Sequence, residues 1–586
     1  MSEAGRTSPV SPIGRIGPIG LIGLIALLLL TTTLHAQRTR AVRGWVPQPP
    51  APRVNAEPAA CAATPLAQET CADGGTSGAS LAAGEVDTII RAAARSLNDT
   101  TMTIAVVDRG GRILGVFRKP GADPANDDQA IGVARTAAFF SHNQAPLSSR
   151  TVRFISGVHF PPGITNTPSA ALYGIENTNR GCDFNVTFND VVAGDEGKCI
   201  PRARRLGGTR CDPFDTSGCG PGIVTGKVFP NDSDSASVNP GGIPLYRVQV
   251  DGARVVGGQL VGAIGVVGVN GDPQRAEYAA VTGAFGAIGT AVVPVPFYPL
   301  PHPGNVFIDG IRLPFLGPNI RLTFNSTGLP NGVRLDDINP GTDTGAFIVA
   351  PQNGGCAAND YLVGPHGSAL GNLSAMEVDA IVRRAVDTAR RTRAAIRLPL
   401  NRFAKMVIAV GDTDGTILAL YRMPDSTVFS VDVAVAKARN VVWFSTSNDL
   451  GIGTANAVTN RTIGFGAQPF YPSGIDSDLL GPDEGPWYRS LFVNDLTNPC
   501  TQGSQPKNAN QNGIVFFAGS SPLYRGNQLV GGLGVSGDGI EQDDYVTYFG
   551  AGPFLPPQSI WADQRIVGDA RLPMFKFPRH PEGVEE

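Results

Sequence analysis

Two polar residue types recur at equivalent positions in two distant segments of the chain. An aspartate precedes a tight, glycine-containing turn at Asp108 and Asp412, and an arginine ends the following apolar run at Arg118 and Arg422. A turn carboxylate most often accepts hydrogen bonds from its own backbone. A guanidinium suits a carboxylate, which can belong either to the fold or to a bound molecule. The favoured interpretation is internal partners for all four residues, and the alternative is a site for a carboxylated ligand.

Three further residues could contact a ligand, although each has a simpler interpretation. Lys437 lies in an apolar, helix-like segment, and its side chain is expected to follow the helix surface into solvent. Ser536 lies in a glycine-rich run and could bind either a ligand or its neighbouring backbone. Tyr524 recurs as Tyr246 and is expected in the core or at its rim.

These residues belong to two similar halves of the chain. Residues 102–118, MTIAVVDRGGRILGVFR, match residues 406–422, MVIAVGDTDGTILALYR, at nine of 17 positions without a gap. Four more matches keep the same order along the chain: EVDTIIRAA with EVDAIVRRA, SRTVRF with NRTIGF, QLVGAIGVVG with QLVGGLGVSG, and Arg-Leu-Pro at Arg312 with Arg-Leu-Pro at Arg571. The sequence therefore predicts a duplicated domain.

Each half carries the same predicted order of elements. In the second half, Ser374 and Glu377 form a capping box before an apolar face with helical spacing. Alternating β-branched residues on both sides of the aspartate turn predict a hairpin, and a second helix, a long loop, a second hairpin and a short helix follow. This order favours an α+β fold with an antiparallel sheet covered by helices.

The N-terminal segment and the limits of the two similar halves predict how the chain divides into domains. Residues 1–36 carry two arginines and then a long apolar stretch, which predicts a secretory signal peptide, with an uncleaved membrane anchor as the alternative. The predicted parts are a linker at 37–80, a first domain at 81–317 (copy one), a linker at 318–372 and a second domain at 373–586 (copy two). Secreted or periplasmic localisation follows from this map.

Eight cysteines, an even number, fit an exported protein with disulfide bonds. Four of them lie between 181 and 220, in a loop-rich stretch that copy two lacks. Disulfides would compensate for the absence of a core in this insertion. Paired zinc-ligand spacing is absent, and the cysteine connectivity stays open because eight cysteines allow 105 pairings.

Several function classes find no support in the sequence. A net charge of −3 gives no footprint for nucleic acid. The glycines at 262, 265 and 268 lack dinucleotide-binding spacing, and we expect them to admit a closely packed helix, with a flat ligand as the alternative. No catalytic constellation recurs in both copies, so we name no catalytic residue and expect a binding protein before an enzyme.

The motifs of both copies, taken together, resemble those of a known family. They are the strand I-A-V-V-D-x-x-G-x-I-L-x-x-x-R, a helix with A-x-A-K-A, then S-P-L-Y-R and L-V-G-G-L-G-V-S-G followed by an acidic pair. This set resembles the GlcG/HbpS-like haem-binding, or haem-degrading, family, which is also seen as the C-terminal domain of PduO. The resemblance implies a profilin-like α/β/α domain, frequent oligomerisation and a haem or related tetrapyrrole ligand.

Copy two is the more similar to the family pattern. Copy one has Val133 opposite Lys437 and Val267 opposite Ser536, so copy one could have lost the ligand. No histidine recurs, since His142 aligns with Thr446, and we do not expect haem held by histidine in both halves. Tyrosinate can ligate ferric haem, which keeps the recurring tyrosine as a candidate. The predicted cofactor-binding residues are Asp412, Arg422, Lys437, Tyr524, Ser536, Asp108 and Arg118.

The leading hypothesis is an exported protein that binds haem or another flat, carboxylated molecule, chiefly through copy two. The two domains would pack as an internal pseudo-dimer, with a higher oligomer also open. The first alternative is a structural or interaction protein that presents disulfide-tied loops to a partner in the cell envelope. A weaker alternative, suggested by the family resemblance, is an enzyme that acts on haem or on a small hydroxy acid.

Overall fold

The computed structural model describes a part of the chain that begins at position 80. The described residues are 80–157, 169–178, 235–251, 254–286, 292–293, 306–308, 311–324, 330–355, 360–453, 456–471, 484–497, 510, 512–568 and 570–582. They all belong to one compact unit of the chain, residues 68–586. The signal segment, all eight cysteines and the insertion at 181–220 lie outside them. Within the described ranges, no helix combines the length and the apolar character needed to cross a bilayer.

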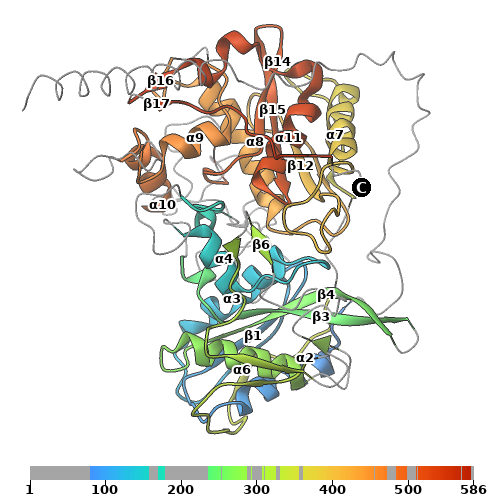
Figure 1. Cartoon of the computed structure of the whole chain (residues 1–586), viewed down its shortest axis with the longest axis vertical. Coiled ribbons are helices and arrows are strands. Elements are labelled where there is room, and N and C mark those ends of the chain that lie inside the picture. The colour runs from blue at the N-terminus through green and yellow to red at the C-terminus, as the bar shows by residue number, and fades with distance from the viewer. Residues whose placement is uncertain are drawn as a thin grey trace, which may run out of the picture. The chain divides into compact units, whose positions relative to one another are not determined.

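Copy one is built on an antiparallel sheet (Figure 1). Its strands are β1 (Thr103–Asp108), β2 (Ile113–Arg118), β3 (Gly242–Asp251), β4 (Arg254–Val267), β5 (Val292–Val293) and β10 (Ala346–Val349), in the order β10-β2-β1-β4-β3-β5. The β1–β2 turn is the predicted aspartate turn, and the strand pair β3–β4 is the second predicted hairpin.

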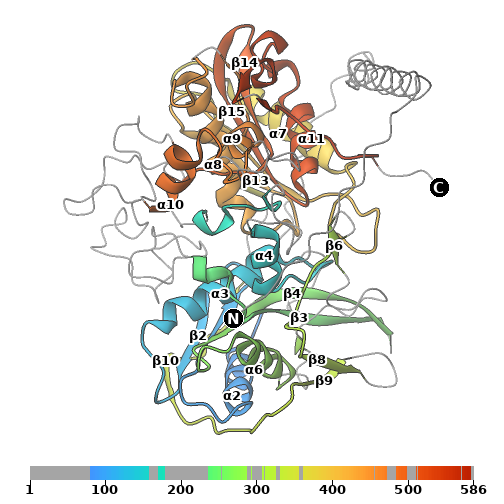
Figure 2. The same cartoon turned by 60° about the vertical axis from the view of Figure 1, so that its left-hand side comes forward.

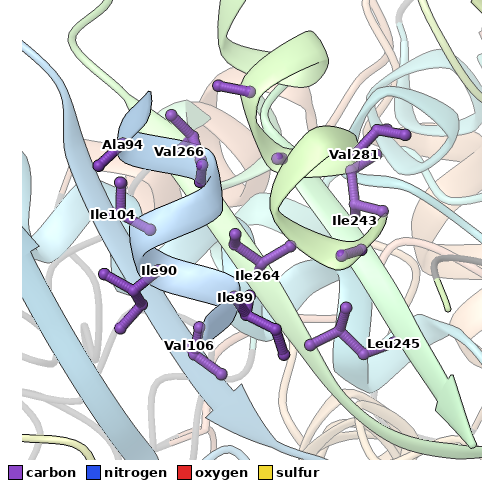
Figure 3. Close-up of a cluster of buried hydrophobic side chains, with 14 of the residues drawn as sticks. Ile89, Ile90, Ala94, Ile104, Val106, Ile243, Leu245, Ile264, Val266 and Val281 are labelled. Carbon is purple, nitrogen blue, oxygen red and sulfur yellow. The ribbon is translucent and has the colours of Figure 1, made fainter. Parts of the chain in front are cut away.

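Helices cover both faces of this sheet. α2 (Ala83–Arg95) and α6 (Pro273–Gly286) lie on one face, where Ile89 and Ile90 of α2 meet Ile104 and Val106 of β1 (Figure 3). α3 (Asn126–Phe140) covers the other face. Because side chains alternate along a strand, β1 supplies both cores, one through Ile104 and Val106 and the other through Ala105. The result is a three-layer α/β/α arrangement.

Copy two repeats this architecture. Its strands are β11 (Asp360–Val363), β12 (Met406–Gly411), β13 (Ile417–Arg422), β14 (Ser520–Arg525) and β15 (Gln528–Gly537), in the order β11-β13-β12-β15-β14, and its helices are α7 (Ala375–Ala389), α8 (Ser430–Thr446) and α11 (Ile540–Ala551). The bulge between Val106 and Val107 recurs between Val410 and Gly411. The predicted capping box of Ser374 is present at the start of α7. The α+β prediction and the predicted order of elements are confirmed.

Shorter elements complete the described part of the chain. The helical ones are α4 (Ser149–Ser156), η1 (Ile175–Asn177), η3 (Ser235–Val238), α9 (Asn460–Gly466), η5 (Tyr488–Val493), α10 (Asn494–Thr497), η6 (Gly552–Phe554), η7 (Gln558–Ile560) and η8 (Ala562–Gln564). The strands are β6 (Phe307–Ile308), β7 (Ile311–Arg312), β8 (Arg321–Phe324), β9 (Pro330–Arg334), β16 (Ile566–Val567) and β17 (Ala570–Arg571).

The segment 318–372, expected from the sequence to be a linker, contains ordered strands. β8 and β9 form a hairpin beside α6 (Figure 2). Its Leu322 and Val333 pack on the core. β10 then pairs with β2 of copy one, and β11 pairs with β13 of copy two. The segment therefore supplies an edge strand to each sheet, which its polar composition did not indicate.

The recurring Arg-Leu-Pro segments have the same contacts in both copies. Thr151 Oγ1 donates a hydrogen bond to Pro314 O (2.7 Å), and Thr462 Oγ1 donates to Pro573 O (2.6 Å). Beside them, Arg150 pairs with Glu277 (2.7 Å), and Arg461 pairs with Asp544. In each copy the closing segment is therefore bound to the short helix that follows the second long helix, α4 in copy one and α9 in copy two.

A strand glycine in each copy allows the helix on the second face to pack closely. Of the three glycines for which this was predicted, Gly265 packs on a helix, whereas Gly262 and Gly268 lie against the backbone of Val107 and Thr101. A Cβ atom on Gly265 would collide with Ala130 O of α3, and one on Gly534 would collide with Ala434 O of α8. The two glycines occupy equivalent strands of the two copies, β4 and β15. A side chain at either position would have to push the helix away from the sheet.

We expect Gly534→Ala to lower the free energy of unfolding by about 1–3 kcal/mol, because overpacking strains both helix and strand. The matched control is Gly84→Ala in the first turn of α2, where a Cβ atom meets nothing within 4 Å. The control should be neutral or stabilising by about 0.5–1 kcal/mol. Urea unfolding checks both values, and equal stability of the two variants would contradict the packing argument.

Buried charges connect copy one to copy two. Arg397 Nη1 pairs with Asp425 Oδ2 (2.6 Å), and its Nε pairs with Asp538. Copy one contributes two residues to this network. Arg109 Nη2 lies 2.6 Å from Asp425 Oδ1, and Gln144 Oε1 accepts a hydrogen bond from Arg397 Nη1 (3.2 Å). Burial opposes ionisation of Asp425, but the two arginines outweigh it and hold the pKa of that carboxyl well below its usual range.

Apolar contacts lie next to this charge network. The rings of Phe140 and Phe429 stack with centroids 4.0 Å apart, and Val428 N donates to Phe139 O (3.0 Å). The two copies therefore meet through packed rings as well as ion pairs.

Replacing Arg397 should be much more costly than replacing an exposed arginine. Arg397→Met leaves two buried carboxylates short of a partner, so we expect a loss of about 3–5 kcal/mol in the free energy of unfolding. The control is Arg489→Met, since the Arg489–Glu484 pair is exposed and should change stability by less than about 0.5 kcal/mol. Similar urea midpoints for the two variants would show that the network does not stabilise the contact.

Candidate functional site

A cavity of about 690 Å³ lies where the two copies meet. Copy one supplies Phe140, Leu147 and Ile155, and copy two supplies Phe429, Phe517 and Phe577. These walls are largely aromatic and aliphatic, while polar groups enter from β15, α11 and the C-terminal segment. The volume is that of a typical small-molecule site, and the wall chemistry suits a flat, apolar ligand.

A buried ion pair, Lys437–Asp543, lies at the side of the cavity that copy two forms. Lys437 Nζ lies 3.0 Å from Asp543 Oδ2, donates to Val535 O (2.7 Å) and sits 5.1 Å from the centroid of the Phe517 ring. Burial lowers the pKa of the Lys437 amine and raises the pKa of the Asp543 carboxyl to about 7. The expected solvent-exposed lysine is wrong, because α8 packs this side chain between the sheet and α11.

One oxygen of the Asp543 carboxylate takes no part in the contact with Lys437. Asp543 lines the cavity, and its Oδ1 has no hydrogen-bond partner among the described residues. A buried acceptor without a partner costs about 1–3 kcal/mol. The position in the first turn of α11 eases this cost, because the helix N-terminus favours negative charge.

A chain of hydroxyl groups borders the same wall. Ser536 Oγ lies 3.1 Å from Ser430 Oγ, which lies 2.7 Å from Thr427 Oγ1. Ser536 and Thr427 both line the cavity. Of the seven predicted cofactor-binding residues, Ser536 is the one that lines the cavity. The sequence suggested a ligand or the neighbouring backbone as its partner, and the structure shows a third partner, the Ser430 hydroxyl.

Basic side chains lie along the part of the cavity formed by copy two. Arg393, Lys576 and Arg579 line it. Lys576 pairs with Glu541, whereas Arg393 and Arg579 have no carboxylate partner among the described residues. Arg393 Nη2 instead donates to Arg579 O (3.2 Å), which brings the two residues together. Two guanidinium groups are therefore available to bind carboxylates of a ligand.

Copy one lacks the polar groups of this wall. Val133 and Val267 replace Lys437 and Ser536, and Ala276 replaces Asp543. The last equivalence follows from the backbone: Ala276 packs on Gly241 as Asp543 packs on Gly519, and these glycines accept the equivalent bonds from Val266 N and Val535 N. Both members of the ion pair are thus replaced by apolar residues in copy one.

The two predicted aspartates bind the backbone and side chains near their turns. Asp108 accepts from Arg112 N and Gly355 N, both at 2.9 Å, and burial raises the pKa of its carboxyl. Asp412 accepts from Thr413 N and from Asn372 Nδ2, both at 2.8 Å. Neither residue lines the cavity. A ligand contact for either one stays a prediction.

The two predicted arginines also have partners inside the fold. Arg118 pairs with Asp127 (2.9 Å), and the buried Arg422 donates to Ser426 O. Neither of them lines the cavity, whereas Arg393 and Arg579 do. Sequence reasoning missed Arg393 and Arg579 because neither one recurs in copy one.

The recurring tyrosines and His142 are buried away from the cavity wall. Tyr524 packs in a hydrophobic cluster, and burial raises its pKa to about 12. Tyr246 donates to His142 O (3.0 Å). His142 Nδ1 accepts from Gln144 N (3.2 Å), and burial, together with Arg397 and Arg109, lowers the pKa of its imidazole well below the usual value. None of the three lines the cavity.

Comparison with known families agrees with this repeated architecture. The model of a family described as "Haem degrading protein HbpS-like" matches residues 81–186 and 379–551. Two tandem regions of the chain are therefore similar to the HbpS-like family. The second match covers α8, β15 and α11, which hold Lys437, Ser536 and Asp543.

Curated relatives share only part of their length with this protein. The corrinoid adenosyltransferase PduO of Salmonella typhimurium is 26% identical over 157 residues, which are 27% of this chain and 34% of the relative. The protein of the same name from Citrobacter freundii is 26% identical over 152 residues, 26% of this chain and 33% of the relative. The chain spans about a third of the length of each relative.

Two solved structures were also found to be similar. One is titled "Crystal Structure of PduOC:Heme Complex", with 22% identity, a TM-score of 0.20 and coverage of 31% of this chain and 94% of that one. The other is Klebsiella pneumoniae protein ORFY, with 21% identity, a TM-score of 0.18 and coverage of 30% and 84%.

The Lys437–Asp543 pair should show strong coupling in a double-mutant cycle. Lys437→Val or Asp543→Ala alone leaves one buried charge without its partner, and we expect each to cost about 3–5 kcal/mol of unfolding free energy. The double variant restores the residues of copy one and should cost less than either single variant. Urea unfolding of the four proteins measures the coupling, and additive losses would contradict a buried ion pair.

Proposed function

We propose that this protein binds haem or another flat, carboxylated tetrapyrrole in the cavity between its two copies. The observation that carries the proposal is the combination of aromatic walls with two arginines, Arg393 and Arg579, that have no carboxylate partner among the described residues. The family description, which names haem, supports the same ligand class.

Two parts of a tetrapyrrole, its apolar ring and its acidic edge, match two features of the cavity, the aromatic walls and the guanidinium groups. Ring atoms of a tetrapyrrole can be buried against Phe140, Phe429 and Phe517, and burial of apolar surface contributes about 25 cal/mol per Å². Carboxylate groups at one edge of the ring can bind the guanidinium groups in pairs of hydrogen bonds. A molecule with one apolar body and one acidic edge uses both features.

Haem itself fits this cavity in part. The walls suit a porphyrin face, and Arg393 and Arg579 suit its carboxylates. Protein ligands of haem iron are commonly His, Cys, Met or Tyr. None of the described residues that line the cavity is of these four types. The described residues therefore fit the ring and its acidic edge but do not fit iron ligation by the protein.

The binding stoichiometry should be one ligand per chain. Copy two presents the polar wall, whereas copy one has Val133, Val267 and Ala276 at the equivalent positions. Copy one instead closes the cavity with Phe140, Leu147 and Ile155. In this proposal the two copies act as an internal pseudo-dimer with a single, asymmetric site.

Export belongs to the same proposal. The apolar stretch behind two arginines at the N-terminus and the even number of cysteines support a secreted or periplasmic protein. A binding protein of this kind would hold the tetrapyrrole outside the cytoplasm. The proposal includes no catalytic step.

Haemin titration of the purified protein tests the proposal. We expect a saturable change of the Soret band with one equivalent of haemin per chain. Arg393→Gln and Arg579→Gln should each weaken binding about tenfold, the effect of losing a charge-assisted hydrogen bond of about 1.5 kcal/mol. The control Arg489→Gln alters an exposed arginine elsewhere and should leave affinity unchanged. A non-saturating response, or equal affinity of all three variants, would remove the proposal.

A further inference from the structure

The connection between α7 and β12 in copy two is longer than its counterpart in copy one. Residues 390–405 (the α7–β12 loop) join these two elements, whereas residues 96–102 join α2 to β1. The loop supplies the cavity with six lining residues, Arg393, Ala394, Ala395, Ile396, Leu400 and Asn401. It is therefore an addition that copy two brings to the wall of the cavity.

The inner side of the α7–β12 loop is held by buried contacts. Arg397 belongs to the charge network between the two copies, where it binds Asp425 and Asp538. Ile396 and Leu398 pack against the same apolar cluster that contains the stacked phenylalanine rings. Since these three side chains are anchored, the outer side of the loop keeps a defined position on the protein.

The outer side of the loop exposes apolar side chains at the cavity. Leu400, which lines the cavity, is 75% exposed, and Phe403 is 50% exposed. Phe403 faces Arg393, another lining residue, across an antiparallel bridge, so the side chains of these two residues lie on the same face. The apolar residues of the counterpart in copy one, Leu97 and Met102, are buried. Single exposed apolar residues are common, but these two lie together at the opening of an apolar cavity.

The α7–β12 loop is also strongly basic. It contains six basic residues and no acidic one, in a chain whose net charge is −3, and its counterpart in copy one contains no basic residue. Arg390, Arg391 and Arg402 are exposed. Arg390 lies 4.0 Å from Asp387 and Arg391 lies 2.9 Å from Glu582, and both pairs are exposed to solvent. Exposed pairs contribute little energy, so an external anionic surface can compete for these arginines.

We propose that the outer side of the α7–β12 loop docks on an anionic lipid bilayer. Leu400 and Phe403 enter the boundary between headgroups and acyl chains, and the exposed arginines bind the lipid phosphates. Burial of apolar side chains and attraction to anionic headgroups act together in proteins that bind a bilayer surface. The cavity then opens towards the bilayer, into which apolar molecules partition.

The charge of the loop favours a bilayer over a second molecule of this protein. Two molecules that met through this loop would bring their basic residues together, and like charges weaken an interface. An anionic bilayer offers an apolar layer beneath a negative surface, which matches the two features of the loop. The inference goes beyond the proposed function, because docking needs no tetrapyrrole in the cavity.

Hydrogen–deuterium exchange of the full chain with lipid vesicles tests the inference. This measurement reports on residues 390–405 by themselves, so the apolar N-terminal stretch does not determine the result. The probes are vesicles of phosphatidylcholine alone and vesicles of phosphatidylcholine with phosphatidylglycerol. We expect exchange in residues 390–405 to slow, saturably, with the anionic vesicles and to stay unchanged with phosphatidylcholine alone. High salt should weaken the effect, because it screens exposed charges.

Variants of exposed residues connect the protection to the loop. Leu400→Ser/Phe403→Ser should raise the lipid concentration needed for half-maximal protection by about tenfold or more, the effect of removing buried apolar groups. Arg402→Gln should raise it about fivefold, the effect of one arginine near an anionic surface. The controls are Met376→Ser, 82% exposed at the opposite end of α7, and Arg489→Gln, and both should leave it unchanged. Urea midpoints should be the same for all of these proteins, because every substitution is on the surface.

Each remaining outcome would overturn the inference. One is a lack of protection with anionic vesicles, and another is equal protection in Leu400→Ser/Phe403→Ser and Met376→Ser. A dimer in sedimentation velocity without lipid, dissociated by Phe403→Ser, would assign the surface to a second molecule of the protein. Haemin titration is carried out without lipid and vesicle docking without haemin, so either proposal can fail while the other stands.

Discussion

The cavity depends on how Arg397 is buried between the two copies. Its guanidinium binds Asp425 and Asp538 of copy two, and Arg109 and Gln144 of copy one meet the same charges. Buried charges tolerate little displacement, because each one needs its partners to offset desolvation. Asp538 belongs to this network, and its chain neighbours Gly537 and Gly539 line the cavity. The network therefore holds this wall of the cavity in place relative to copy one.

The two copies keep one scaffold but differ in the chemistry of a single wall. Strand order, bulge position and the Arg-Leu-Pro contacts recur, so the fold constrains these features in both. Lys437 and Asp543 are replaced together by Val133 and Ala276, so neither copy keeps one member of this pair without the other. Copy one can therefore serve as an apolar wall while copy two holds the polar contacts.

Sequence reasoning predicted most of the fold and little of the site. The recurring strands, the Ser374 capping box and the close helix packing at Gly265 follow from local patterns, and the structure has them. The edge strands β10 and β11 escaped prediction because strand pairing at a sheet edge depends on the neighbouring strand more than on composition. Lys437 was assigned to solvent because its partner Asp543 lies over a hundred positions away along the chain. Arg393 and Arg579 carry no local signal and become neighbours only in the folded protein.

A crystal structure of the protein with a bound tetrapyrrole tests the central claim most directly. The account predicts ligand density between Phe140 of copy one and Phe517 of copy two, with the ligand carboxylates at Arg393 and Arg579. Density on the outer surface of either copy, away from these residues, would contradict it.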